Sequence, residues 1–173
     1  MKKTKISPIV VTVIAIVQTI SMLSVIQPAA FAEKIEGDEG PNTLIGTPGN
    51  DKIDSKGGND RNYGDTRRGD GSGDDKINSG EGDDLNFGDT TFGEGSGDDK
   101  IKSGKGDDVN FGDTDPAFGG TGSGDDKINA GQGDDELTGN GGADKFQCGK
   151  GEDTVTDFNP EEGDKATGNC ENT

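Results

Sequence analysis

Apolar residues are sparse in this chain, and beyond residue 45 they return at intervals of nine. Eleven nine-residue blocks begin at Thr47, Lys56, Gly71, Gly80, Gly95, Gly104, Asp113, Gly122, Gly131, Asn140 and Gly149. Position seven of these blocks holds Ile53, Asn62, Ile77, Asn86, Ile101, Asn110, Gly119, Ile128, Leu137, Phe146 and Val155. One short apolar stretch per block, bounded by glycine, predicts one short strand per block. A fixed short period indicates a stacked β-solenoid, in which many small units share one thin core.

Isoleucine and asparagine alternate at position seven through the first six blocks. In the asparagine blocks the apolar residues stand one place to either side, as Leu85 and Phe87 do around Asn86. Because successive side chains of a strand point to opposite faces, this pattern predicts that alternate strands are shifted by one residue. One inner face would then carry a ladder of isoleucines, and the opposite inner face would carry pairs of larger residues.

Glycine and aspartate occupy fixed places between the predicted strands. Position three is glycine in ten blocks, namely Gly49, Gly58, Gly73, Gly82, Gly97, Gly106, Gly124, Gly133, Gly142 and Gly151. Position five is aspartate in the same ten blocks, namely Asp51, Asp60, Asp75, Asp84, Asp99, Asp108, Asp126, Asp135, Asp144 and Asp153. Glycine allows the positive φ that a tight turn needs, and the turn places backbone carbonyls beside the carboxylate. Such an all-oxygen set fits a hard cation, and the need for flexible, high coordination favours several calcium ions over magnesium, zinc, copper or iron.

A longer period lies over the nine-residue one. The blocks at Thr47, Gly71 and Gly95 are 24 residues apart, and the block at Gly122 follows after 27, because spacers at 65–70, 89–94 and 113–121 interrupt the repeat. Each spacer opens with Asp-Thr, and we expect loops that leave the stack at one recurrent corner. The block 113–121 also lacks the glycine, the aspartate and the apolar residue of the motif. It is predicted to be a bulging loop or a coil without calcium that divides the roll into two halves.

The first 32 residues have a different composition from the rest. Lys2, Lys3 and Lys5 precede a largely apolar run over 6–26, and the small residues of Ala30-Phe31-Ala32 follow. This order predicts a signal peptide over 1–32 and a secreted or extracellular, cell-surface-associated protein. The alternative is an uncleaved membrane anchor, since the run is long enough to span a bilayer. The remaining chain divides into a linker over 33–44, the repeat roll over 45–157 and a capping segment over 158–173.

Charge and composition exclude several classes of function. The formal net charge is −18, which disfavours nucleic acid and anionic lipid as partners, because both are bound through lysine and arginine. The chain has no histidine, so a serine or cysteine nucleophile would lack its usual base. Aspartate pairs such as Asp74-Asp75 would point to opposite faces of a strand, giving one ligand and one solvated carboxylate. The chain is therefore predicted to be no enzyme.

Two cysteines, Cys148 and Cys170, both lie in the part expected to be exported. An oxidising location favours a disulfide between them, which would stabilise the C-terminal segment by about 3 kcal/mol. Two free thiols are the alternative.

The repeat resembles the RTX, or hemolysin-type calcium-binding, family, whose nonapeptide is G-G-x-G-x-D-x-U-x with U apolar. Residues 131–139 and 141–146 match it closely, and the likeness extends over about 45–157. The resemblance implies an all-β fold, a right-handed parallel β-roll with two nonapeptides per coil and calcium between adjacent turns. It also implies that the ten position-five aspartates and the carbonyls of the ten position-three glycines are the ligands. Two functions fit, namely a calcium-dependent extracellular or cell-surface module whose partners are surface or matrix components, and an accessory secretion or folding domain of an exported enzyme or toxin system.

Overall fold

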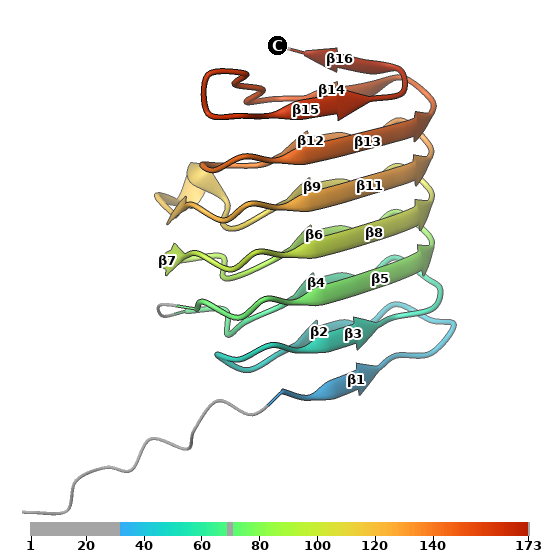
Figure 1. The fold of residues 1–173 in the computed structure, drawn as a ribbon. Helices are drawn as coiled ribbons and strands as arrows, with labels where there is room; N and C mark the ends of the chain where they lie inside the picture. The colour runs from blue at the N-terminus through green and yellow to red at the C-terminus, as the bar shows by residue number, and fades with distance from the viewer. Residues whose placement is uncertain (1–31, 69–70, 173) are drawn as a thin grey trace, which may run out of the picture.

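The computed structural model describes residues 32–68 and 71–172. The chain winds into a parallel β-roll in which two sheets of seven strands face each other (Figure 1). The first sheet has the order β1-β3-β5-β8-β11-β13-β15, and the second has the order β2-β4-β6-β9-β12-β14-β16. The strands of the first sheet are β1 (Lys34–Glu36), β3 (Lys52–Asp54), β5 (Lys76–Glu81), β8 (Lys100–Lys105), β11 (Lys127–Gln132), β13 (Lys145–Lys150) and β15 (Lys165–Thr167). Those of the second are β2 (Thr43–Ile45), β4 (Arg61–Tyr63), β6 (Leu85–Phe87), β9 (Val109–Phe111), β12 (Glu136–Thr138), β14 (Asp153–Val155) and β16 (Cys170–Asn172).

Each strand of the first sheet begins with an exposed lysine, and in β3, β5, β8, β11 and β13 a buried apolar residue follows it. In β8, for example, Lys100 faces solvent and Ile101 faces inward. Register aligns these residues between coils, so that Ile101 lies beside Ile77 on one side and Ile128 on the other. The predicted isoleucine ladder is therefore confirmed, and alternation along the strand produces it.

The second sheet contradicts the predicted one-residue shift of alternate strands. Asn62, Asn86 and Asn110 are fully buried, and Asn110 lies in register with the buried Leu137. Position seven thus points inward in these blocks as well. The amide of Asn62 donates to Oδ1 of Asn86 at 2.9 Å, and that of Asn86 donates to Oδ1 of Asn110 at 2.9 Å. The asparagine side chains hydrogen-bond one another along the ladder, so their amide groups can be buried with partners. The strands therefore keep position seven on the inner face and the neighbouring apolar residues on the other face.

The aromatic residues beside the asparagines form a column on the opposite face of the second sheet. The rings of Tyr63 and Phe87 stack with centroids 5.1 Å apart, and those of Phe87 and Phe111 stack at 5.0 Å. The guanidinium of Arg67, in the first spacer, lies 5.1 Å from the centre of the Tyr63 ring. The spacers therefore cover apolar surface on the outside of the second sheet.

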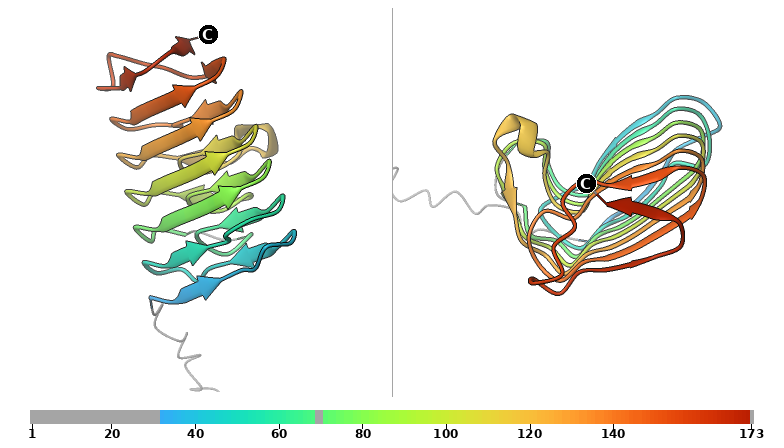
Figure 2. Two further views of the ribbon diagram at one scale, coloured as in Figure 1. Left: turned by 90° about the vertical axis from the view of Figure 1, so that its right-hand side faces the viewer. Right: turned by 90° about the horizontal axis from the view of Figure 1, so that it is seen from above.

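The three spacers form a lobe beside the roll, as expected of loops that leave at one corner (Figure 2). This lobe contains the short parallel pair β7 (Glu94–Gly95) and β10 (Thr121–Gly122) and the 3₁₀ helix η1 (Pro116–Phe118). The segment 113–121 is a bulging loop, as predicted, but it does not divide the roll. β9 pairs directly with β12, and β8 pairs directly with β11. A loop that starts and ends at the same corner leaves both sheets continuous.

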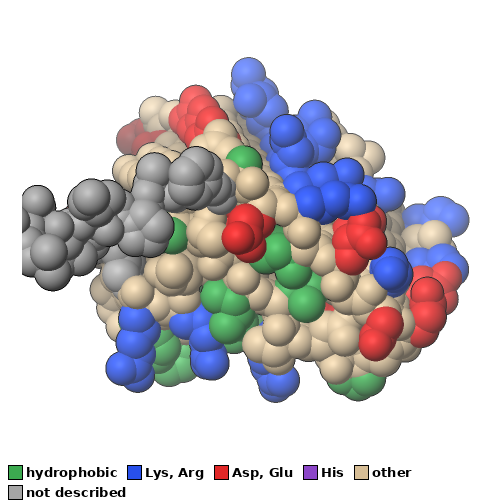
Figure 3. Space-filling view, turned by 90° about the horizontal axis from the view of Figure 1, so that it is seen from below, with side chains coloured by type: hydrophobic (Ala, Val, Ile, Leu, Met, Phe, Trp, Pro, Cys, Tyr) green, Lys and Arg blue, Asp and Glu red, His purple; other side chains and the backbone are tan. Residues whose placement is uncertain are grey.

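Both ends of the roll extend beyond the predicted boundaries. The segment 33–44, expected to be a linker, contributes β1 and β2, which pair with β3 and β4. The segment 158–173, expected to be a cap, contributes β15 and β16 to the same two sheets. These strands keep the alternation of the repeat without its preceding Gly-x-Gly turn, so the motif did not reveal them. Viewed from the N-terminal end, hydrophobic side chains are visible at the surface (Figure 3), and Ile45 is 41 % exposed.

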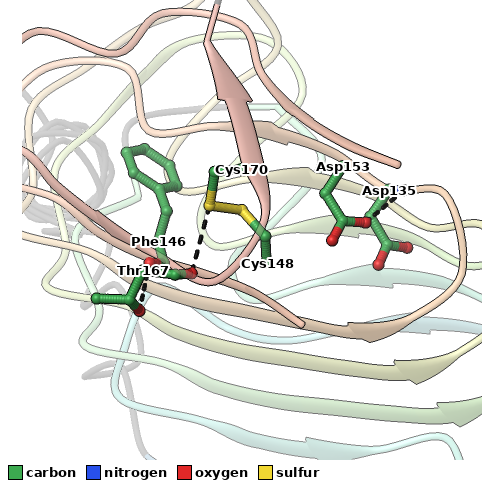
Figure 4. The surroundings of a disulfide bond; sticks show 6 residues. All are labelled: Asp135, Phe146, Cys148, Asp153, Thr167 and Cys170. Carbon is green, nitrogen blue, oxygen red and sulfur yellow. Dashed lines mark hydrogen bonds between the residues drawn. A yellow bond between two sulfur atoms is a disulfide. The ribbon is translucent and has the colours of Figure 1, made fainter. Parts of the chain in front are cut away.

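A disulfide joins Cys148 of β13 to Cys170 of β16, which confirms the predicted pairing (Figure 4). The two Cα atoms are 5.4 Å apart and 22 residues separate them in sequence. The bond links β16, at the end of the last coil, to β13 of the coil before it.

The predicted signal peptide lies outside the described residues, apart from Ala32. In the described part of the chain, no helix has the length and apolar character needed to cross a membrane.

Candidate metal centre

All ten position-five aspartates are buried, and they stand in two columns along the roll. The columns lie where the turns meet the strands of the first sheet and of the second sheet, respectively. The first column contains Asp51, Asp75, Asp99, Asp126 and Asp144, and the second contains Asp60, Asp84, Asp108, Asp135 and Asp153. The neighbouring acid of each pair faces solvent, as Asp98 does beside the buried Asp99. The two acids of a pair thus differ in burial as expected, and the ligand role of the buried one remains a prediction.

One oxygen of each carboxylate is fixed by the coil next to it. The backbone N–H of Asp99 donates to Oδ1 of Asp126 at 2.8 Å, and the same bond links Asp84 to Asp108 at 2.8 Å in the second column. These bonds repeat from coil to coil along both columns. Each aspartate therefore joins two successive coils and holds its own side chain in one orientation.

The other oxygen has no hydrogen-bond partner in nine of the ten aspartates, which are Asp60, Asp75, Asp84, Asp99, Asp108, Asp126, Asp135, Asp144 and Asp153. The exception is Asp51, whose Oδ2 accepts from the hydroxyl of Thr47 at 3.0 Å. A buried carboxylate oxygen without a partner is costly, and proteins normally satisfy it with a donor or a cation. No lysine or arginine forms an ion pair with these groups among the described residues. The donor set is thus all oxygen and negatively charged.

Backbone carbonyls converge on the unpaired oxygens of the first column. A Cβ atom added to Gly64 would lie 1.7 Å from the carbonyl oxygen of Gly88 and 2.2 Å from Oδ2 of Asp75. One added to Gly88 would lie 1.7 Å from the carbonyl oxygen of Gly112 and 2.1 Å from Oδ2 of Asp99. Glycine therefore leaves a small cradle in which a carbonyl and a carboxylate oxygen face the same point. These carbonyls belong to glycines that end the strands, and the nonapeptide motif did not single them out.

The position-three glycines have a clear steric role. A Cβ on Gly97 would lie 1.9 Å from the carbonyl oxygen of Gly73, and one on Gly106 would lie 2.2 Å from that of Gly82. Successive turns stack too closely for any side chain. Positive φ occurs at Gly106 and throughout the turns that lead into the second sheet, but Gly73 and Gly97 do not have it. Among the position-three glycines that lead into the first sheet, only Gly142 has positive φ. The expected need for positive φ thus holds for all the turns into the second sheet and for one turn into the first, and the predicted ligand role of the position-three carbonyls remains a prediction.

Burial strongly disfavours the charged form of these carboxyls. It raises the pKa of Asp99 to about 11, and the charges of Asp89 and Asp126 add to the rise. Burial likewise raises the pKa of Asp75 and of Asp108 to about 8. At neutral pH such groups require either a proton or a cation, because like charges this close cannot all remain ionised.

The structure adds acidic residues that the nonapeptide pattern did not predict. Asp164 continues the first column, since the N–H of Asp144 donates to its Oδ1 at 2.9 Å. Asp65, Asp89 and Asp113, the first residues of the spacers, are fully buried beside the same column. The recurrent Asp-Thr at the start of each spacer was the available signal. The nine-residue period alone places this dipeptide at the start of a loop and not in the site.

The comparisons with known proteins address the repeat itself. Residues 30–64 and 120–155 each match the family model described as RTX calcium-binding nonapeptide repeat (4 copies). The coils between the two matched segments have the same strand register, and the spacers interrupt their nine-residue period. Searches of curated proteins and of solved structures found no match to the chain.

Proposed function

Because this chain carries the calcium-binding nonapeptide repeats of the RTX family, we propose that it is a secreted, non-enzymatic protein whose β-roll folds when it binds several calcium ions. In the folded state it acts as an extracellular or cell-surface structural or interaction module. The observation that carries the proposal is that nine buried carboxylate oxygens, distributed over the two columns, have no hydrogen-bond partner. Calcium supplies positive charge and accepts many oxygen ligands in flexible geometry, which these turns offer.

The ligands proposed are the position-five aspartates and backbone carbonyls of the turns. The Oδ1 atoms are already used by the N–H groups of the neighbouring coil, so the Oδ2 atoms face the ion. In the first column the carbonyl oxygens of Gly88 and Gly112 face the same points as Oδ2 of Asp75 and Asp99. The chain thus orients its donors through the stacking of the coils.

Calcium binding and folding are expected to be one process. The chain carries a net charge of −18, and only 25 % of its residues are hydrophobic, so the apolar core contributes little against the repulsion of the aspartates. The two columns of aspartates form only when the coils stack on one another. Each ion would contact ligands from more than one coil, so its site is absent from the unfolded chain. Binding free energy is then folding free energy, as in other proteins whose site is absent from the unfolded chain.

Circular dichroism and small-angle scattering of the purified chain, in EGTA and in millimolar calcium, test this function. We expect an expanded chain with little β-structure in EGTA and a compact β-protein in calcium. Magnesium at the same concentration is the control for ionic strength and should produce much less folding. A compact β-protein in EGTA at neutral pH, unchanged by calcium, would contradict the proposal. Fractionation of producing cells, with chelator release of envelope-bound protein, tests the proposed location.

A further inference from the structure

The spacers bring a third row of carboxylates to the first aspartate column. Asp65, Asp89 and Asp113 open the three spacers and are 0 % exposed. They stack on one another, since the N–H of Asp65 donates to the carbonyl of Asp89 at 3.4 Å and that of Asp89 donates to the carbonyl of Asp113 at 3.1 Å. The lobe of Figure 2 therefore begins with acidic residues that lie inside the molecule and not on the exposed part of a loop.

One oxygen of each spacer carboxylate is held by the turn that follows the spacer. Oδ2 of Asp89 accepts from the N–H of Gly97 at 3.2 Å, and Oδ2 of Asp113 accepts from the N–H of Gly124 at 3.4 Å. Oδ1 of Asp89 and Oδ1 of Asp113 have no partner, although both are buried. This arrangement repeats that of the position-five aspartates, with one fixed oxygen and one unsatisfied oxygen on each carboxylate.

The carboxylates of two spacers lie close to that of a position-five aspartate. Carboxylate oxygens of Asp89, Asp99 and Asp113 lie within 4.8 Å of one another. Oδ2 of Asp99 also lacks a partner, and the carbonyl oxygen of Gly112 faces the same cradle. Three buried carboxylates, each with one oxygen that lacks a partner, thus lie close together, and a backbone carbonyl lies beside one of them.

The separation of the oxygens fits a large cation. With ligands at 2.3–2.6 Å, opposite oxygens around calcium are about 4.6–5.2 Å apart. Around magnesium, whose ligands lie at 2.0–2.1 Å, they are about 4.0–4.2 Å apart. Oxygens that all lie within 4.8 Å of one another fit within the span of the calcium ligands and can share one calcium ion without moving.

We propose that Asp89 and Asp113 bind a calcium ion together with Asp99 and the Gly112 carbonyl, in a three-carboxylate site that the nonapeptide motif does not specify. The ion fastens two spacers to the roll, so the lobe is ordered by calcium as the roll is. The three carboxylate ligands make this corner a stronger site than the turns of the second column, because affinity for calcium rises with the number of charged ligands. The inference rests on the proposed function, since it assigns additional ligands to the same class of site.

The double variant Asp89→Asn/Asp113→Asn tests the site in the full chain. The matched control is Asp83→Asn/Asp107→Asn, which removes the same charge from two exposed aspartates that also stand 24 residues apart. Calcium titration calorimetry should show at least one ion fewer in the test variant than in the parent and the control. Hydrogen exchange at saturating calcium should become faster in 89–94 and 113–121 of the test variant only.

A single variant tests the site if the double variant does not fold. If the double variant does not fold in calcium, the single variant Asp113→Asn is compared with Asp107→Asn. The former should need about tenfold more calcium, or more, for half-maximal folding. Equal stoichiometry and equal calcium dependence in test and control would overturn the site, because the carboxyls would then be satisfied by protons alone. A parent that gains no β-structure in calcium would instead overturn the proposed function.

Discussion

At the scale of single residues, each position-five aspartate combines two opposite demands. Its Oδ1 accepts a backbone hydrogen bond that stacks one coil on the next, as between Asp99 and Asp126. Its Oδ2 is buried without a hydrogen-bond partner in every one of these aspartates except Asp51. The first interaction stabilises the roll, whereas the second destabilises it whenever the carboxylate is ionised and no cation is bound. The same residue thus stabilises or opposes the fold according to what occupies its second oxygen.

This dependence predicts opposite effects of pH with and without calcium. The folded-state pKa of Asp99 is about 11 and that of Asp75 is about 8, whereas an unfolded aspartate titrates near about 3.9. Between these values the folded chain holds protons that the unfolded chain has released, so stability without metal falls as pH rises. In EGTA we therefore expect more β-structure by circular dichroism at pH 5 than at pH 8. In calcium the fold should persist at pH 8, because the ion replaces the proton.

The exposed aspartates provide the control for this pH effect. Asp98→Asn should leave the pH dependence in EGTA unchanged, whereas Asp99→Asn should reduce it, since only Asp99 is buried. More β-structure in EGTA at pH 8 than at pH 5 would be incompatible with the raised pKa values.

At the scale of elements, the second sheet changes its inner face along the roll. β4, β6 and β9 direct Asn62, Asn86 and Asn110 inward, and β12 and β14 direct Leu137 and Val155 to the same place. The asparagine ladder is supported from the first sheet, where serines face it. The hydroxyl of Ser79, for instance, donates to Oδ1 of Asn86 at 2.7 Å. The N-terminal half of the roll thus has a partly polar core, in which hydrogen-bonded asparagines and serines lie beside the isoleucine ladder, whereas the core of the C-terminal half is mainly apolar.

Truncation of the central asparagine should be costly for this reason. Asn86→Ala removes the partner of Asn62 and of Asn110 and leaves buried polar groups unsatisfied. We expect the free energy of unfolding in saturating calcium to fall by about 2 kcal/mol or more. Asn129→Ala, on the outer face of β11, is the matched control and should change it by less than about 0.5 kcal/mol. Urea denaturation measures both values, and equal losses would show that the ladder contributes nothing specific.

These elements also show how far the sequence alone could lead. The strand in every block except 113–121 and the isoleucine ladder follow from a nine-residue period and strand alternation, and the structure contains them. The inward direction of Asn86 could not be deduced from its own strand, because the asparagines with which it forms hydrogen bonds lie 24 residues away in sequence. For the same reason the spacer acids of the candidate site, such as Asp89, looked like loop residues, since their role depends on stacking between coils.

At the scale of the whole molecule, the roll behaves as a row of coils that contact mainly their neighbours. Stability in such a solenoid is approximately a sum of coil and interface terms, so it can differ from one end to the other. The C-terminal coils hold Leu137, Phe146 and Val155 in an apolar cluster, and the Cys148–Cys170 disulfide closes them. The N-terminal coil leaves Ile45 41 % exposed. The contrast in core composition therefore predicts an order of unfolding along the roll.

Hydrogen exchange followed by mass spectrometry should reveal that order when calcium is limiting. Amides of β2 and β4 should exchange at least about tenfold faster than those of β12 and β14, because opening the N-terminal coils exposes less apolar surface and breaks no covalent bond. Reducing the disulfide should bring the exchange rates of the two groups of strands closer together. The bond stabilises the folded chain by about 3 kcal/mol on the chain-entropy estimate and acts only on the C-terminal coils. Calcium added back should then protect β12 and β14 before β2 and β4. Uniform protection along the roll, or earlier opening of β12 and β14, would show that the aspartate columns hold all the coils as one cooperative unit regardless of the core beneath them.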